Sequence, residues 1–245
     1  MQNFKLTVCY EGTRYRGWQR QGNTSGTIQG KLEAILSRML GQSIELAASG
    51  RTDAGVHARM QVCSFRAETE KKPEELLAEL RRYLPEDIGA SALEFAPPRF
   101  HARLNCVEKT YLYRVWNSDG PNVFSRRFQY RLPEDLDLKA MSTAAGLLCG
   151  EHDFAAFSSL KDSRRSTVRH LRRIELKREG PELQLFFSGD GFLYNMVRIL
   201  TGTLLEVGLG QRAPEEMTEI LLSGDRSRAG FTAPAWGLTL WEVRY

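Results

Sequence analysis

The chain has 245 residues, 42% of them hydrophobic and 26% charged, which is ordinary for a globular protein of one large or two smaller domains. Its 34 Lys and Arg outnumber its 30 Asp and Glu, and the formal charge of +4 permits a polyanionic partner without requiring one. The N-terminus has no apolar signal core, and no apolar stretch reaches the length of a membrane span. We therefore expect a soluble, cytoplasmic protein with no membrane partner.

The first half of the chain alternates short strands with amphipathic helices. The predicted elements are strands at 4–10, 44–47, 60–65 and 88–95, a helix at 28–40 between the cap Thr27 and Gly41, and a second helix that opens at Pro73 and carries Leu76, Leu77, Leu80 and Tyr83. The order β-α-β-β-α-β is typical of the split-βαβ arrangement.

After a connector around Pro97-Pro98 the same order recurs, without a repeat in the sequence itself. The predicted elements are strands at 107–116, 168–176, 183–188 and 239–243, and helices at 138–148, 192–207 and 214–222. The pattern predicts an α+β fold of two split-βαβ domains, similar to ferredoxin or RRM folds, at 1–103 and 104–245. We expect antiparallel sheets side by side with flanking helices and a cleft between the domains, where ligands commonly bind.

The segment 48–58 forms a loop between two predicted strands and carries Arg51 and Asp53 between Gly50 and Gly55. Loops on a rigid sheet often hold catalytic side chains. A simple Asx-turn, with Arg51 solvated, is the alternative.

Other site types find little support in the sequence. The chain has no G-x-S-x-G motif and no glycine-rich phosphate loop, and its four cysteines and four histidines show no metal-ligand spacing. We therefore expect reduced cysteines, no metal and no nucleotide cofactor.

The remaining candidate for chemistry is the single carboxylate of Asp53 in this loop, together with arginines and tyrosines elsewhere in the chain. Arg198 lies within an apolar helical run and either snorkels to the surface or pairs with Asp53 in the interior. Tyr111 is either a core residue or a stacking platform for a base. Six of the thirteen residues from Lys161 to Arg173 are Lys or Arg, which suits contact with phosphates.

The loop Gly50-Arg51-Thr52-Asp53-Ala54-Gly55-Val56-His57 resembles the signature of the tRNA pseudouridine synthase A family. The resemblance continues, in the family's order, through Tyr10–Thr13, Gly17–Gln21, Phe100–Arg103, Lys109–Tyr111, Gly150–Phe154, Phe192–Arg198 and Ala233–Leu238. It implies isomerisation of uridine to pseudouridine in the anticodon stem-loop of tRNA, at positions 38, 39 and 40. It also implies a homodimer in which one tRNA contacts both subunits, and no cofactor.

The resemblance also implies roles for particular residues. Asp53 is the catalytic nucleophile, Arg198 pairs with it, and Tyr111 stacks on the target base and takes part in proton removal. Leu238 packs beneath the base, and Arg51 fills the gap that the flipped nucleotide leaves. The C-terminal domain thus supplies the rest of an active site whose Asp loop lies in the N-terminal one.

The basic segments are interpreted as a surface that follows the tRNA backbone. The candidate RNA-binding residues are Arg51, Phe100, His101, Arg103, Lys161, Arg164 and Arg165, with Arg99 as a further candidate.

Three points stay open at this stage. The carboxylate either adds to C1′ or to the base ring, or removes a sugar proton to give a glycal. A non-catalytic RNA-binding module is the main alternative function, because split-βαβ sheets with aromatic residues also hold single-stranded RNA. A nucleoside hydrolase is the second alternative, although most glycosidases use two paired carboxylates.

Overall fold

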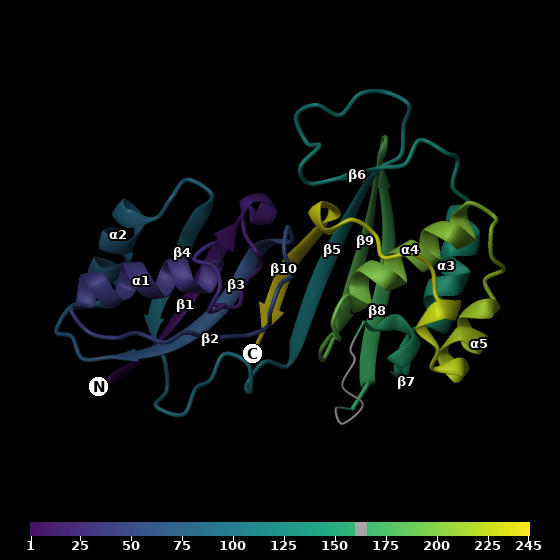
Figure 1. Cartoon of the computed structure of the whole chain (residues 1–245). Helices are drawn as coiled ribbons and strands as arrows, with labels where there is room; N and C mark the ends of the chain where they lie inside the picture. Colours follow the sequence, from purple (N-terminus) through teal and green to yellow (C-terminus); the bar gives the residue numbers. More distant parts are fainter. Residues whose placement is uncertain (160–165) are drawn as a thin grey trace. The chain divides into compact units, whose positions relative to one another are not determined.

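The computed structural model describes residues 1–159 and 166–245. The chain forms two compact units, residues 1–107 with 240–245 and residues 108–239 (Figure 1). The sequence-based division at residue 103, which gives the terminal strand to the second domain, stays a prediction. In both units helices accompany strands, so the fold is mixed α+β.

The first unit is built around an antiparallel sheet in which β1 lies between β4 and β3. Its elements are β1 (Gln2–Tyr10), a 3-10 turn (Gly12–Arg14), α1 (Ile28–Leu40), β2 (Ala47–Ala48), β3 (His57–Ala67), α2 (Pro73–Tyr83) and β4 (Ile88–Phe95). The strand order is β4-β1-β3, with β2 also paired to β3, and the terminal β10 (Leu238–Arg244) follows β3. The predicted β-α-β-β-α-β order is confirmed here.

Local sequence signals explain these boundaries. The side chain of Thr27 accepts a hydrogen bond from the Gly30 amide, and Gly41 ends α1 in the left-handed conformation at φ 63°. Alternate residues of β1 are buried, and Phe4 stacks on Phe65 with ring centroids 5.1 Å apart. One expectation was wrong: Tyr83, which was grouped with the apolar face of α2, is 55% exposed at the last turn of that helix.

The second unit contains a sheet with strand order β5-β9-β8-β7. Its elements are β5 (Glu108–Trp116), β6 (Tyr130–Arg131), α3 (Leu138–Leu147), β7 (Gly150–Asp153), a 3-10 turn (Ala155–Phe157), β8 (Val168–Glu179), β9 (Glu182–Gly189), α4 (Met196–Gly208), α5 (Glu216–Ser223) and 3-10 turns at Arg226–Arg228 and Ala235–Gly237. The sheet is mixed, because β6 pairs with β5 in parallel. The expectation of purely antiparallel sheets was therefore wrong, and β6 and β7 were not predicted.

The start of α4 also differs from the predicted helix at 192–207. The helix begins at Met196, because its N-cap Asn195 adopts the left-handed conformation at φ 60°, which breaks the helical path. From Met196 onward α4 is buried on nearly all sides, and it packs with α3 in the interior of the unit. Among the described residues, no helix is long and apolar enough to cross a membrane.

Candidate active site

The loop that carries Asp53 is fastened to β3 at its entry. The Ser49 amide donates to the Val62 carbonyl at 2.8 Å, and the Ser49 hydroxyl donates to Gln61 Oε1 at 2.6 Å. Gln61 Nε2 in turn donates to the Gly50 carbonyl at 2.9 Å. Ser49 and Gln61 are both fully buried, so these bonds are shielded from water and fix the direction in which the loop leaves the strand.

The middle of the loop is held by Thr52, one residue before Asp53. The Thr52 hydroxyl shares a 2.7 Å hydrogen bond with the Tyr10 hydroxyl, and the Thr52 carbonyl accepts from the Trp18 amide at 3.0 Å. Burial raises the pKa of Tyr10 above its usual range, so this phenol stays protonated and available for the bond. Tyr10, Trp18 and Thr52 are all buried. The backbone just before Asp53 is therefore held in place by buried contacts.

The segment before α1 packs directly against this loop at Gly17. A Cβ there would lie 2.7 Å from the Thr52 carbonyl oxygen, and Gly17 has a φ of 91°, which other residues rarely adopt. The Gly17-Trp18 pair of the sequence motif is therefore explained by its contact with the loop: Gly17 leaves room for Thr52, and the Trp18 amide binds the Thr52 carbonyl.

Asp53 opens a tight turn whose closing bond uses its main chain. The Val56 amide donates to the Asp53 carbonyl oxygen at 3.1 Å, and Gly55 has a φ of 80° within the turn. Because the main-chain oxygen closes the turn, the carboxylate is not needed for that bond. The Asp53 residue is half-buried and Arg51 is exposed.

His57 closes the loop on its far side, a contact that sequence reasoning missed. The imidazole is buried, and its Nδ1 accepts from the Gly12 amide at 3.0 Å. That bond requires an unprotonated Nδ1, so His57 contributes structure at the end of the motif.

In the second unit, Tyr111 lies on β5 and is 7% exposed. Its ring and that of Phe192 form a T-shaped pair with a centroid distance of 5.0 Å and an interplanar angle of 81°. The neighbouring Thr110 shares a 2.8 Å hydrogen bond with Ser188 on β9. Phe192 belongs to the motif around Arg198, and its contact with Tyr111 was not predicted.

Arg198 lies in the first turn of α4 and is half-buried. Its Nε donates to the Ala233 carbonyl at 2.7 Å, and its Nη1 donates to Asn195 Oδ1 at 2.9 Å. A guanidinium held by two defined acceptors does not fit the alternative of a snorkelling side chain. Asn195 therefore has a double role, ending the preceding loop in a left-handed turn and orienting the arginine.

Tyr113 connects Arg198 to the face of β5 that carries Tyr111. Burial raises the pKa of the Tyr113 phenol, while the charge of Arg198 acts in the opposite direction. The Tyr113 hydroxyl donates to the Pro234 carbonyl at 2.8 Å. Because Tyr111 and Tyr113 are two residues apart on one strand, their side chains share a face. Pro234 accepts from Tyr113, and the neighbouring Ala233 accepts from Arg198. Leu238 is buried a few residues further on.

Apart from Arg51 in the Asp53 loop, the predicted RNA-binding residues in the described parts of the chain lie just before β5. Phe100 packs its ring against Tyr245 at 5.0 Å, and His101 Nδ1 accepts from the amides of Arg103 and Leu104 at 3.1 and 3.3 Å. Arg103 is exposed, whereas Phe100 and His101 are half-buried and also serve the local turn. Lys161, Arg164 and Arg165 lie outside the described residues.

The first unit thus holds Arg51, Asp53 and the Phe100–Arg103 segment, and the second holds Tyr111, Arg198 and Leu238. The pairing of Asp53 with Arg198 stays a prediction. Within residues 1–159 and 166–245, no group of three or more His, Cys, Asp or Glu side chains is arranged to hold a metal ion.

Comparison with known proteins identifies the family of this chain. A family model described as tRNA pseudouridine synthase matches residues 6–104 and 144–245. A tRNA pseudouridine synthase A of Bacillus sp. (strain KSM-64) is 46% identical over 245 residues, which are 100% of both chains. The chain belongs to the tRNA pseudouridine synthase A family.

Other relatives agree with this membership. The tRNA pseudouridine synthase A of Geobacillus kaustophilus is 44% identical over 100% of this chain and 95% of its own, and the tRNA pseudouridine synthase A 2 of Clostridium tetani is 41% identical over 100% and 99%. A solved structure described as a Cbf5-Nop10-Gar1 complex is similar over 82% of this chain and 45% of its own, at 16% identity and a TM-score of 0.37. That score is too low to support an argument.

As a tRNA pseudouridine synthase the protein is an isomerase, and the geometry above describes how its signature residues are supported. Sequence reasoning assigned no supporting role to Tyr10, Gln61, His57, Tyr113, Phe192 or Asn195. Four of these residues lie within the quoted motifs, but no local signal marked their contacts, most of which join residues far apart in the chain.

Proposed function

We propose that this chain converts uridine to pseudouridine at positions 38, 39 and 40 of tRNA, on the 3′ side of the anticodon stem-loop. The observation that carries the proposal is the loop Gly50–His57, which resembles the family signature and holds Asp53 next to buried, hydrogen-bonded residues. The reaction must break the N1–C1′ bond, rotate the detached uracil and join C5 to C1′. No redox change is involved, so positioned side chains are sufficient in principle.

Asp53 is proposed as the nucleophile. An ionised carboxylate is needed for that role, and a nearby cation favours ionisation. Arg198 is the proposed cation, because its guanidinium is pre-oriented by Asn195 and Ala233 rather than free to rotate. The exact adduct, to C1′ or to the ring, and the glycal route all remain compatible with this arrangement.

Tyr111 and Leu238 are proposed to hold the target base. The aromatic ring of Tyr111 is fixed by Phe192, and base stacking on such a ring contributes roughly 1–3 kcal/mol. Buried apolar side chains around the base keep water away while uracil is detached, and hydrolysis is thereby avoided.

The target base must leave its stack, at a cost of a few kcal/mol. Arg51 is exposed beside Asp53, and its guanidinium is suited to fill the vacated space and to contact phosphates. Exposed basic residues such as Arg103 are proposed to follow the tRNA backbone. A homodimer in the cytoplasm, with one tRNA contacting both subunits, completes the proposal, and sedimentation of the purified protein tests its dimeric state.

The variant Asp53→Asn tests the chemical role. It removes the charge and the nucleophile while keeping the size of the side chain, so tRNA binding should survive. Release of tritium from tRNA labelled at C5 of uridine should fall to background. Undiminished tritium release would contradict the assignment of Asp53.

The same reaction mixtures distinguish the alternatives. A non-catalytic RNA-binding module predicts tRNA binding and no tritium release from the wild-type protein. A nucleoside hydrolase predicts accumulation of free uracil, which chromatography detects. The proposed isomerase predicts tritium release without free uracil.

A further inference from the structure

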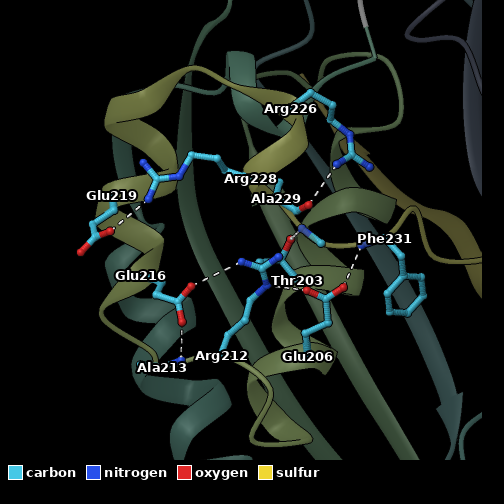
Figure 2. A network of polar contacts seen from close by, with 11 residues as sticks. Thr203, Glu206, Arg212, Ala213, Glu216, Glu219, Arg226, Arg228, Ala229 and Phe231 are labelled. Atoms are coloured by element: carbon cyan, nitrogen blue, oxygen red, sulfur yellow. Dashed lines mark hydrogen bonds and ion pairs between the residues drawn. The ribbon is translucent and has the colours of Figure 1, made fainter.

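A polar network on the second half of α4 fastens the segment 229–233 to that helix (Figure 2). Glu206 Oε1 accepts from the Phe231 amide at 3.0 Å, and Thr203 Oγ1 accepts from the Gly230 amide at 2.9 Å. Thr203 is fully buried and the Glu206 side chain is 17% exposed. The bond from the Gly230 amide to Thr203 is therefore buried, whereas the bond from the Phe231 amide to Glu206 lies at the surface.

The carboxylate of Glu206 is itself held by Arg212. The Arg212 Nε donates to Glu206 Oε2, while its Nη1 lies 3.4 Å from Glu216 Oε2. Glu216 Oε1 accepts from the Ala213 amide at 2.8 Å. Both oxygens of Glu206 are thus engaged, one by the segment and one by the arginine.

The segment lies against the helix at van der Waals distance. A Cβ at Gly230 would lie 2.7 Å from Glu206 Oε2 and 2.8 Å from the Thr203 Cα. Arg226 also donates to the Ala229 carbonyl at 3.2 Å and to Thr232 Oγ1 at 3.1 Å. The segment from 229 to 232 is therefore held by Arg226 as well as by α4.

The same segment leads to the acceptor that orients Arg198. The Ala233 carbonyl accepts from Arg198 Nε at 2.7 Å, and the Ala233 amide donates to the Arg198 carbonyl at 3.1 Å. Glu206 and Arg198 are on one helix, about 12 Å apart along its axis. Glu206 binds Phe231 at one end of this short stretch of backbone, and Arg198 binds Ala233 at the other.

We propose that Glu206, held by Arg212, is a positioning residue that sets the guanidinium of Arg198 through the backbone of Phe231 to Ala233. The inference rests on the catalytic role proposed above for Arg198. Glu206 itself contacts neither tRNA nor the reacting atoms in this scheme. Its loss changes the orientation of Arg198 and therefore the rate of the chemical step.

The test compares single-turnover rate constants of Glu206→Ala, Arg198→Lys and the double variant, together with tRNA affinity. Arg198→Lys keeps a charge but lacks the planar guanidinium with its Nε donor. We expect each single change to lower the rate constant about tenfold or more, with tRNA affinity within about twofold. We expect the double variant to be little slower than Arg198→Lys alone, because both changes act on one group.

Matched variants separate positioning from general damage. Glu206→Gln keeps an oxygen that can accept from the Phe231 amide, and we expect a rate between those of Glu206→Ala and the wild type. Arg228→Gln removes an exposed ion pair with Glu219 on the same side of the unit and should leave the rate unchanged. If Glu206→Ala does not fold, Arg212→Gln takes its place in the cycle with the same expected non-additivity.

Three results would overturn the inference, in two distinguishable ways. Rate losses that multiply in the double variant, or an unchanged rate in Glu206→Ala beside an impaired Arg198→Lys, reject Glu206 as a positioning residue while the role of Arg198 stands. A fully active Arg198→Lys rejects both the proposed role of Arg198 and the inference that depends on it.

Discussion

At the scale of single residues, the candidate site depends on buried hydroxyl groups that bind one another rather than solvent. Tyr10 and Thr52 come from β1 and from the Asp53 loop, and their hydroxyls are 2.7 Å apart. Neither residue performs chemistry in the proposed scheme. Their bond determines where the backbone enters the turn at Asp53, so the position of this proposed catalytic side chain depends on them.

Tyr10→Phe should destabilise the protein by about 1–2 kcal/mol, because Thr52 keeps a buried hydroxyl that loses its partner. Urea unfolding measures this difference. Tyr83→Phe is the matched control, since Tyr83 is 55% exposed, and it should change stability by no more than about 0.5 kcal/mol. Equal effects of the two substitutions would contradict the structural role assigned to Tyr10.

At the scale of elements, the segment between β1 and α1 serves as a support for the Asp53 loop. Its contact with the loop is backbone against backbone at Gly17 and Thr52, so it cannot adjust by moving a side chain. A change there is transmitted directly to Asp53, the neighbouring proposed catalytic residue.

Gly17→Ala should destabilise the protein by roughly 1–3 kcal/mol and reduce activity, because it adds both a steric overlap and strain at a positive φ. Thermal unfolding and tritium release measure the two effects. Gly22→Ala, in the same segment but with open space around the added Cβ, should behave like the wild type. A stable, active Gly17→Ala protein would show that the contact with Thr52 is loose.

The strands β5 and β9 are also joined by the carboxylate of Glu182. Arg114 donates to both oxygens of Glu182, at 2.7 and 2.8 Å, and Gln129 donates to Glu182 Oε2. Burial acts to raise the pKa of Glu182, but the bonds from Arg114, Gln184 and Gln129 prevail and hold it below its usual value. Ionised Glu182 therefore favours the folded state.

This pKa shift predicts how stability depends on pH. The stabilisation is fully present above the unfolded pKa of about 4.3 and is lost as the pH falls through the lower folded pKa. Glu182→Gln should therefore be less stable than the wild type at pH 7, and the difference should shrink as the pH falls below about 4. Glu94→Gln, which removes an exposed ion pair with Lys5, should show little difference at either pH. A stability difference between Glu182→Gln and the wild type that does not change with pH would contradict the claim that Glu182 is ionised in the folded state.

At the scale of the whole molecule, sequence was most informative where strong local signals set boundaries. The predicted bounds of α1 and β4 match the structure, because Thr27 and Gly41 delimit the helix and Pro97-Pro98 follows the strand closely. The start of α4 was misplaced, because an apolar run continues through Asn195 and hydrophobicity does not reveal a left-handed residue. The short polar strand β7 carries no alternating pattern.

For the candidate site, the motifs pointed to Asp53, Tyr111 and Arg198, whose roles the family resemblance implies and which stay predictions. The residues that hold them were not predictable, since Tyr10 lies 42 positions from Thr52 and Tyr113 lies 121 from Pro234, and only the folded chain brings them together. Long-range support of this kind has no local sequence signal.

The central claim is that this chain isomerises uridine on the 3′ side of the tRNA anticodon stem-loop with Asp53. It is tested most directly by incubating a tRNA transcript with purified protein and mapping pseudouridine by carbodiimide labelling and primer extension. The account predicts stops that report positions 38 to 40 with the wild type and none with Asp53→Asn. Pseudouridine confined to other positions, or an unchanged map with Asp53→Asn, would contradict it.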